Sequence, residues 1–497
     1  MSLRPTLFTV FCLMCLSLFF FTNLSVPVFG EMINSQVFGE NINSQVTSVD
    51  LQNRTFGSFN AIDWNEDMSI RIGVMEKQKT IKVSCETPLI FSSQGEQVVL
   101  EGKTEYSFRV KTSKPARLAF HPVVRTVPAK KKEVLTAELN KWNEGNLKAK
   151  LCRAGGKIKF RKMLIHDNSR YYVALPSFSS KEDCEASFQH IQKRAAHKPW
   201  PLEILETAAT GTMELVDKTG IVLATFDKPV SITSKKHIKV FDVEYGVGYS
   251  WHGYQNRHFR GQVEIRIDKT GNLQFVNELD IENYIKGVVP SEMSANYPIE
   301  ALCAQAIAAR GETLAKYGVR HLADPYFLCS AQHCQVYGGV TKEHANTNKA
   351  VEDTSGRILR AGSHIADTVY SACCGGHTES NENVWSTDAS SALRGVADLR
   401  PDATPFPVEM TKENLKKWWT KSGDGWCSFS SPTYASRYRW KADFTRAKLN
   451  SLVEKKYPAV GDVIDLIPLK RGLSGKLVEL KIVGLKNMHS DMRMTYI

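Results

Sequence analysis

Residues 286 to 310 read KGVVPSEMSANYPIEALCAQAIAAR, and this stretch says most about the fold. A turn that carries one acid, Glu292, comes before an alanine-rich helix. Asn296 can cap this helix, Pro298 suits its first turn, and Gly318 supplies a stop. Small side chains surround the helix, so neighbouring elements can approach its backbone closely. We therefore expect the helix to be buried.

Two polar residues, Gln305 and Arg310, interrupt this surface of small side chains. A buried polar group costs about 1–3 kcal/mol unless it finds a partner, so we expect both side chains to face a polar cleft. The alternative is that they satisfy one another. The direction of the pKa shift of Glu292 stays open. A nearby helix N-terminus would lower this pKa, whereas apolar neighbours such as Val288 and Met293 would raise it.

The chain has 497 residues, of which 42% are hydrophobic and 10% aromatic, which is typical of a globular protein of two or three domains. Arg4 precedes an apolar run over residues 7–21, and small residues follow near position 30. This pattern predicts a signal peptide at residues 1–30 and export to the periplasm or cell envelope. An uncleaved membrane anchor is the alternative, because the apolar run could extend to residue 29.

A net charge of +12 favours contact with anionic surfaces. The charge is spread along the chain, and the short run from Lys130 to Lys132 is typical of a solvated loop before a helix. The sequence contains no zinc-finger spacing, RNA-binding consensus or basic zipper. We therefore expect no nucleic acid among the partners.

The first part of the chain divides into three segments. Residues 31–64 form a polar linker that contains a tandem nine-residue duplication. Short apolar segments between turns predict a β region at residues 65–160. Residues 165–208 run from a strand with Tyr171-Tyr172 through a Pro-Ser-Phe-Ser-Ser turn into a helical pattern, and they resemble the SPOR domain, a small α/β module of the ferredoxin-like or ribonucleoprotein type. The resemblance implies binding of peptide-free glycan strands, and a plain α/β spacer is the alternative.

Strand signals recur between residues 211 and 275. Tyr249, Trp251, Tyr254 and Phe259 lie there among glycines and polar residues. Aromatic rings stack well on sugar faces, but they also fill β cores. Both interpretations stay open.

Four candidate metal ligands, His321, Cys329, His333 and Cys334, follow the helix within fourteen residues. Thiolate and imidazole are the usual ligands of zinc, and four of them could close a tetrahedral Zn²⁺ site. The spacing is unlike a zinc finger, and the adjacent His333 and Cys334 would point in different directions in an extended segment. A disulfide between Cys329 and Cys334, or free thiols, is the alternative.

Four motifs occur in order around these ligands. They are ENYIKGVVPSEM at residues 282–293, EALCAQAIAAR at 300–310, CSAQHCQVY at 329–337 and CGGHTE at 374–379. Together they resemble the stage II sporulation protein D and amidase-enhancer family (SpoIID/LytB). The resemblance covers roughly residues 210–490, where we expect one catalytic domain within a strand-rich α+β protein.

The resemblance implies a lytic transglycosylase or muramidase-like enzyme that cleaves peptidoglycan glycan strands, preferably after an N-acetylmuramoyl-L-alanine amidase has removed the stem peptides. Glu292 stands in the family's catalytic position. One acid suffices for this chemistry, whereas ordinary glycosidases need two carboxyl groups. The acid protonates the glycosidic oxygen and then, as a base, deprotonates the sugar's C6 hydroxyl, which attacks the anomeric carbon. Gln305, Arg310 and Tyr337 are the candidates for sugar binding.

Two other functions stay open. A non-catalytic amidase enhancer would bind glycan or the amidase, and a thiol hydrolase would use Cys329 or Cys334 with His333. Sporulation and cell division are both compatible settings. The chain departs from the common family pattern at Cys373 and Cys374, where many members carry serines. These thiols could add metal ligands or form a bridge.

Overall fold

The computed structural model describes residues 58–64, 68–144, 147–385, 387–403, 411–420, 425–428, 437–488 and 491–496. The predicted signal peptide and most of the predicted linker lie outside the described residues. Within the described ranges, no helix is both long and apolar enough to cross a membrane. Helices are combined with several separate sheets, which confirms the α+β class.

The chain divides into two compact units, with the boundary between Thr368 and Val369. Among the described residues, the first unit contains residues 58–368 and the second contains residues 369–496. The single catalytic domain predicted at residues 210–490 therefore needs correction, because it crosses this boundary.

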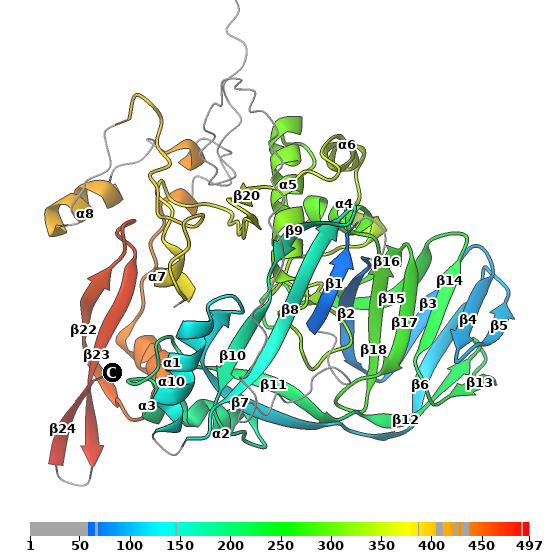
Figure 1. Ribbon diagram of the computed structural model, residues 1–497, viewed down its shortest axis with the longest axis horizontal. Coiled ribbons are helices and arrows are strands. Elements are labelled where there is room, and N and C mark those ends of the chain that lie inside the picture. The colour runs from blue at the N-terminus through cyan, green and yellow to red at the C-terminus, as the bar shows by residue number, and fades with distance from the viewer. Residues whose placement is uncertain are drawn as a thin grey trace, which may run out of the picture. The chain divides into compact units, whose positions relative to one another are not determined.

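The first unit contains a β-sandwich (Figure 1). Its strands are β2 (Ile70–Gln78), β3 (Thr80–Ser84), β4 (Leu89–Ser93), β5 (Glu96–Leu100), β6 (Glu105–Lys114), β12 (Thr210–Val216), β13 (Val222–Phe226), β14 (Val230–Ser234), β15 (Ile238–Tyr245), β16 (Gly253–Phe259), β17 (Gln262–Ile267), β18 (Leu273–Leu279) and β19 (Leu328–Cys329). One sheet has the order β13-β12-β6-β3-β15-β16 and the other β19-β2-β18-β17-β14-β4-β5. Strands from before residue 115 and after residue 209 occur together in both sheets. The predicted boundaries at 160 and 210 therefore do not separate independent domains.

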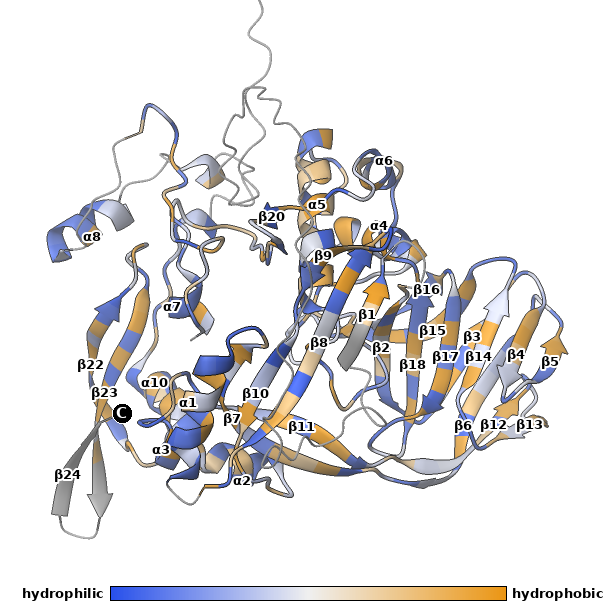
Figure 2. Cartoon of the chain, viewed as in Figure 1, coloured by the Kyte–Doolittle hydropathy of each residue, from blue (hydrophilic) through white to orange (hydrophobic). Residues whose placement is uncertain are grey.

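The sandwich core follows from alternating apolar and polar residues along its strands (Figure 2). Buried positions alternate with less buried ones in β3, β4 and β14, since successive side chains of a strand point to opposite faces. β18 is buried along almost its whole length and, together with β17, packs against β6 of the other sheet. Phe91 and Phe108 meet in this core with ring centroids 6.0 Å apart.

An α/β module is inserted into the sandwich between β6 and β12. Its elements are β7 (Arg117–Pro128), α1 (Lys132–Asn143), β8 (Lys150–Phe160), β9 (Met163–Asp167), β10 (Arg170–Ala174), α2 (Lys181–Ala186), α3 (Phe188–Ile191) and β11 (Trp200–Thr207). β6 leads into β7, and β11 leads into β12. β6 is hydrogen-bonded to β12 and β7 to β11, so a long two-stranded ribbon joins the module to the sandwich (Figure 1).

The module has the β-α-β-β-α-β topology of ferredoxin-like folds, with the antiparallel sheet order β8-β10-β7-β11. The segment predicted at residues 165–208 supplies only the second half of this topology. The first half is β7, α1 and β8, which precede that segment in the sequence. The boundary at residue 165 therefore needs correction.

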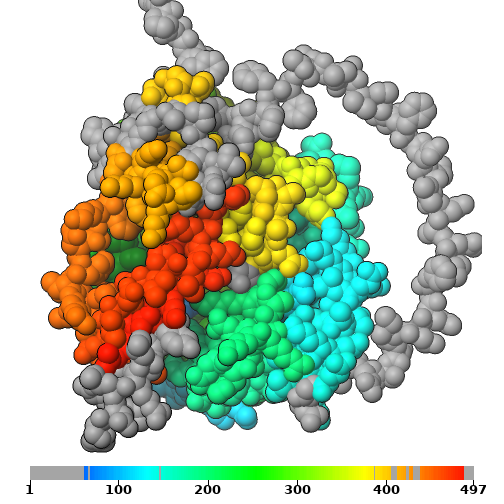
Figure 3. Space-filling view, turned by 90° about the vertical axis from the view of Figure 1, so that its left-hand side faces the viewer, coloured from blue at the N-terminus to red at the C-terminus, as the bar shows by residue number. Residues whose placement is uncertain are grey.

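One face of the module's sheet is covered by its own helices. Trp142 of α1 and Ile191 of α3 belong to one buried cluster with Val124 and Val173 of the sheet. In Figure 3, the cyan residues of the module's first half lie beside green residues of its second half. This shared core explains why the two halves fold as one module.

The opposite face packs against the chain just after α5 (Ile299–Lys316). Tyr172 and Leu202 share a buried cluster with Val319 and Leu322, and the Tyr172 hydroxyl donates a 2.7 Å hydrogen bond to the Val319 carbonyl. Ribonucleoprotein-type modules bind their ligands on an open sheet face through aromatic side chains. This face is covered here. The glycan binding implied by the SPOR resemblance therefore cannot use it.

The end of the predicted linker forms β1 (Ser58–Asp63), which pairs in parallel with β8. The Asp63 carboxylate accepts hydrogen bonds from the backbone N–H groups of Arg161 (3.2 Å) and Lys162 (2.6 Å). The predicted linker at residues 31–64 needs correction at its C-terminal end, because these residues are part of a sheet.

Three helices of the first unit, α4 (Ile281–Glu292), α5 and α6 (Ala345–Asp353), pack against one another. The short element η2 (Val340–Lys342) precedes α6, and β20 (Arg360–Ala361) and β21 (His364–Ile365) follow it. α5 is buried along most of its length, as its small side chains predicted. It begins after Pro298 and is not capped by Asn296, and Gly318, with a φ of 71°, follows its end.

The second unit is built from few regular elements. They are α7 (Asn381–Trp385), α8 (Lys412–Thr420), η3 (Trp426–Ser428), α10 (Arg446–Lys456), β22 (Asp462–Arg471), β23 (Leu477–Met488) and β24 (Asp491–Tyr496). β22, β23 and β24 form an antiparallel sheet. Val453 of α10 packs with Val460 and Val463 in a small cluster beside this sheet.

Candidate functional site

Glu292 is the last residue of α4, and its side chain is exposed. Its Oε1 accepts a 2.7 Å hydrogen bond from the backbone N–H of Val336. The sequence predicted a turn at Glu292, and this expectation needs correction, because the residue is helical. The residue lies at the C-terminal end of the preceding helix, where the backbone carries a partial negative charge.

The segment that donates this hydrogen bond is fixed at both ends. Cys329 of β19 pairs with Gly73 of β2, and the Ser330 N–H donates a 2.9 Å bond to the Gly73 carbonyl. At the other end, the Gly338 N–H bonds to the Gly287 carbonyl of α4 at 3.1 Å. The sandwich and α4 thus hold the chain between them next to Glu292.

Tyr337 is an anchor of this segment and is buried. Its hydroxyl donates a 2.7 Å hydrogen bond to Asn277 Oδ1, and its ring lies so close to Gly287 that an added Cβ would come within 2.5 Å. The neighbouring Gln335 is also buried and donates to Thr313 Oγ1 of α5 at 2.9 Å. The sugar-binding role predicted for Tyr337 needs correction, because the side chain faces the core.

Arg310 is completely buried and forms a bidentate ion pair with Glu282, with nitrogen–oxygen distances of 2.9 and 2.7 Å. Its Nη1 also donates to the Arg357 carbonyl at 2.9 Å. Arg310 therefore joins α5 to α4 and does not face a cleft, so the predicted sugar-binding role needs correction. Glu282 is the partner that burial of a guanidinium demands.

Gln305 is buried as well, with 3% of its surface exposed. Among the described residues, its Nε2 has no hydrogen-bond partner. The predicted pairing between Gln305 and Arg310 does not occur, because Glu282 takes the guanidinium. A direct role for Gln305 in sugar binding needs correction on the same ground of burial.

The four predicted metal ligands do converge. One ligand atom from each of His321, Cys329, His333 and Cys334 lies within 4.8 Å of all the others. His321 Nε2 is 3.3 Å from the Cys334 sulfur, and His333 Nδ1 is 3.6 Å from the same sulfur. Soft thiolate and imidazole donors at this spacing suit a zinc ion.

His333 and Cys334 approach one site because their segment is not extended. The Cys334 N–H bonds to the Ala331 carbonyl at 3.1 Å, which closes a turn and brings adjacent side chains to the same side. The expectation that they would diverge was wrong for this reason. Cys329 and Cys334 are free thiols in this structure and are not joined by a disulfide.

Electrostatics favour a charged His321 and a Cys334 thiolate. Burial opposes charge on His321, but hydrogen bonds with Asp324 and Cys334 outweigh it and raise the pKa of His321 to about 9. The pKa of Cys334 is held well below its ordinary value, mainly by hydrogen bonding from Cys329, whose own pKa is raised in turn. The negative charge of the pair therefore resides on Cys334.

Asp324 is a site residue that the sequence analysis missed. Its Oδ2 lies 3.2 Å from His321 Nδ1, and Lys269 pairs with its other oxygen at 2.9 Å. A carboxylate on the far nitrogen of a ligating histidine fixes the ring orientation. The signal was present as His-Leu-Ala-Asp over residues 321–324, where a turn brings the two side chains together.

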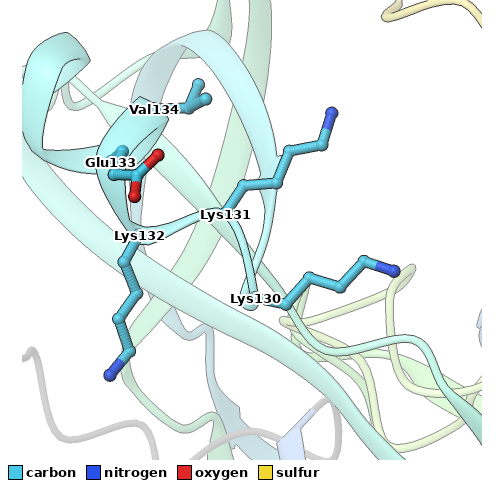
Figure 4. A pocket seen from close by; sticks show the side chains of 5 residues that line it. All are labelled: Lys130, Lys131, Lys132, Glu133 and Val134. Carbon is cyan, nitrogen blue, oxygen red and sulfur yellow. The ribbon is translucent and has the colours of Figure 1, made fainter.

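A surface hollow elsewhere is lined by residues 130–134 (Figure 4). Lys132 points the opposite way from Lys130 and Lys131, so the three ammonium groups do not converge on one anion. All three lysines are exposed, as a solvated loop before α1 should be. The hollow includes none of the candidate site residues.

Comparisons with known proteins cover parts of the chain. Residues 269–360 match the family model "Stage II sporulation protein" (SpoIID), and residues 379–493 match a "Domain of unknown function" (DUF8618). An uncharacterized protein of Brachyspira hyodysenteriae is 45% identical over 112 residues, which are 22% of this chain and 30% of that protein.

Two relatives from Bacillus subtilis have informative names. Its amidase enhancer is 34% identical over 158 residues, which are 31% of this chain and 21% of the relative. Its stage II sporulation protein D is 30% identical over 152 residues, which are 27% of this chain and 43% of the relative. The chain thus spans less than half the length of each of these relatives.

Proposed function

We propose, from the premise that this chain belongs to the SpoIID/LytB family, that it acts on the cell wall as a lytic transglycosylase, cleaving peptidoglycan glycan strands with Glu292 as its acid and base. Peptide-free strands are the preferred substrate. Export to the cell envelope goes with this function, since the substrate lies outside the cytoplasm.

The observation that carries the proposal is the setting of Glu292. Its carboxyl group is exposed, while its backbone ends a helix and its Oε1 is held by the Val336 N–H. An exposed acid on a rigid support can reach a long polymer and keep a defined orientation.

The reaction needs one carboxyl group. Glu292 transfers its proton to the glycosidic oxygen as the C1–O bond breaks, and it then takes the proton of the C6 hydroxyl. The C6 oxygen forms the new bond to C1, which leaves a 1,6-anhydro end. Proton transfer by a positioned acid contributes about 10²–10⁴-fold to the rate.

The cluster of His321, Cys329, His333 and Cys334 is proposed to hold zinc, because its donors are those that zinc prefers. Bound zinc would supply a structural tie. Val336, whose N–H holds Glu292, comes two residues after Cys334. The protein itself positions the Val336 N–H next to Glu292, and bound zinc would hold the segment that carries Val336 in that position.

The β15–β16 hairpin supports a carbohydrate substrate. Phe259 is buried in the core, but Tyr249, Trp251 and Tyr254 are exposed. The rings of Tyr249 and Trp251 stack with centroids 4.4 Å apart and planes 17° apart. An exposed stacked pair of this kind offers a flat apolar surface to a sugar ring.

A second candidate function is that of a non-catalytic amidase enhancer, which the name of one relative favours. It would bind glycan or an N-acetylmuramoyl-L-alanine amidase and would not need a proton donor. The two functions make opposite predictions for the Glu292→Gln variant.

The deciding experiment digests peptide-free glycan strands with wild type and Glu292→Gln in water enriched in ¹⁸O. We expect wild type to release products with anhydro ends that contain no solvent oxygen, because the C6 hydroxyl is the nucleophile. The variant should lose about 10²–10⁴-fold in rate. Solvent oxygen in the products would instead indicate a hydrolase.

Glu300→Gln is the matched control, because Glu300 is another exposed acid of the same unit, in the first turn of α5. It should retain wild-type activity. If wild type cleaves nothing while both variants stimulate a purified amidase as well as wild type does, the enhancer function replaces the enzymatic one.

A further inference from the structure

A second cluster of metal-type donors lies in the second unit. One ligand atom from each of Cys374, Asp398 and Cys427 lies within 4.8 Å of the other two. The Cys374 sulfur is 3.4 Å from the Cys427 sulfur and 3.2 Å from Asp398 Oδ2. The Cys373 thiol also interacts with Cys427. These residues come from three separate stretches of the chain, so folding has brought them together.

The turn that carries Cys374 is shaped for a sulfur ligand. Gly375 and Gly376 have φ values of 73° and 96°, which side chains rarely adopt. The turn aims the Gly376 N–H at the Cys374 sulfur, 3.3 Å away. A sulfur that accepts an N–H bond is stabilised as a thiolate. Gly376 also packs so tightly that an added Cβ would come within 3.0 Å of Trp418 and Tyr438.

Two cationic side chains hold the same turn from outside. Lys476 Nζ donates to the carbonyls of Cys374 (3.0 Å) and His377 (2.8 Å). Arg439 Nη1 donates to the Gly375 carbonyl at 2.9 Å. Positive charge beside this turn favours thiolates, which are the form that binds a metal.

The described part of the second unit has little apolar core to support this arrangement. Among its described residues the buried apolar side chains are Leu415, Trp418, Cys427, Tyr438, Val453, Val460 and Val463. Small cores of this kind are commonly reinforced by a structural metal or by disulfides. The valines form their own cluster near β22, so the region around Cys427 depends on the remaining four.

We propose that Cys374, Cys427 and Asp398 bind a structural zinc ion. Cys373 lies outside this group of mutually close ligand atoms, but its thiol interacts with Cys427, and it would supply the fourth donor when the metal is bound. The donors are those of zinc, and zinc–sulfur bonds of about 2.3 Å place tetrahedral ligands roughly 3.5–3.8 Å apart, close to the spacing seen here. A disulfide fits less well. It requires a sulfur–sulfur distance of about 2.05 Å, and it would leave a third thiol and a carboxylate without a role.

The site is separate from the first cluster, and the inference does not rest on the proposed function. The test measures zinc per chain in the purified full-length protein. Wild type should hold two zinc ions, and the double variants Cys374→Ser/Cys427→Ser and Cys329→Ser/Cys334→Ser should each hold one. Cys303→Ser is the matched control, because Cys303 is half-buried on α5 and belongs to neither cluster. It should keep both ions.

The outcomes separate the two sites. If wild type holds one ion and only Cys374→Ser/Cys427→Ser abolishes it, the second site stands and the first fails. If Cys374→Ser/Cys427→Ser retains all wild-type zinc, the inference is overturned. Cobalt-loaded wild type adds a measurement of donor type, since its thiolate-to-metal absorption should fall in Cys374→Ser/Cys427→Ser.

A measurement on wild type alone covers the case of a variant that does not fold. Cys373, Cys374 and Cys427 should resist alkylation in the native protein and become reactive after chelation, while the reactivity of Cys303 stays the same. Alkylation of all three without a chelator would contradict the site. Protection that only a reductant removes would assign a disulfide in its place.

Discussion

The two clusters of cysteine use similar donors, but the chain builds them by different means. In the first unit, a strand pairing at Cys329 and the buried Tyr337 hold the segment that carries Cys334. In the second unit, a glycine turn and two cationic side chains position Cys374. The first cluster is added to a framework with an extensive core of its own, whereas the described residues around the second cluster include few buried apolar side chains.

This difference assigns different roles to a metal in the two units. Removing it from the first cluster should loosen the loop beside Glu292 and leave the sandwich folded. Removing it from the second should cost that unit its fold, because metal-binding energy is then folding energy. Three variants of the first unit sharpen the comparison, since each should change its stability or the pH dependence of its stability without a change in zinc content.

The largest effect is expected at the buried ion pair. Glu282→Ala leaves Arg310 completely buried with no counter-charge, which should cost about 3–5 kcal/mol. Chemical denaturation followed by tryptophan fluorescence measures the loss. The double variant Glu282→Leu/Arg310→Met should lose less than the single one, because no charge remains buried. A loss below about 1 kcal/mol for Glu282→Ala would contradict the role of the pair.

A smaller effect is expected at Tyr337. Tyr337→Phe keeps the ring against Gly287 but leaves Asn277 Oδ1 without its hydroxyl donor, at a cost of about 1–3 kcal/mol. Because the side chain is buried, KM for glycan strands should not change. A raised KM for Tyr337→Phe at unchanged stability would show that Tyr337 binds sugar after all, and that it is not only a core residue that supports the site.

The smallest effect concerns pH. Burial raises the pKa of Glu312 to about 8, although the Lys316 ammonium opposes the shift and the Asp367 carboxyl adds to it. The folded protein therefore holds a proton that the unfolded chain releases near its ordinary pKa of 4.5. Stability that is present below that pH is lost as the pH rises towards 8.

Glu312→Gln should flatten this dependence, by on the order of 1 kcal/mol or more between pH 5 and pH 8. Thermal unfolding at several pH values measures it. Arg320, which also faces Glu312, stays charged throughout this range. An unchanged slope in the variant would show that another group controls the pH dependence of the first unit.

Local sequence patterns predicted the elements that depend on neighbouring residues. The alanine-rich helix, its stop at Gly318 and the exposed lysine loop all follow from short-range rules of sterics and spacing. The same patterns supplied the four candidate metal ligands, but only the turn seen in the structure brings His333 and Cys334 together. The α+β class and the family followed from recurring patterns and ordered motifs.

Tertiary structure decided everything that depends on distant partners. The sequence predicted Arg310 and Tyr337 as site residues, but in the structure Arg310 forms an ion pair with Glu282 and Tyr337 donates a hydrogen bond to Asn277. A buried polar side chain needs a hydrogen-bond partner, and tertiary packing decides which residue that partner is. The inserted module was seen only in half, since β7 and β10 pair across about fifty residues of sequence. The sequence by itself determined which chemical groups the protein owns; long-range packing, which no local pattern encodes, determined which of them reach solvent.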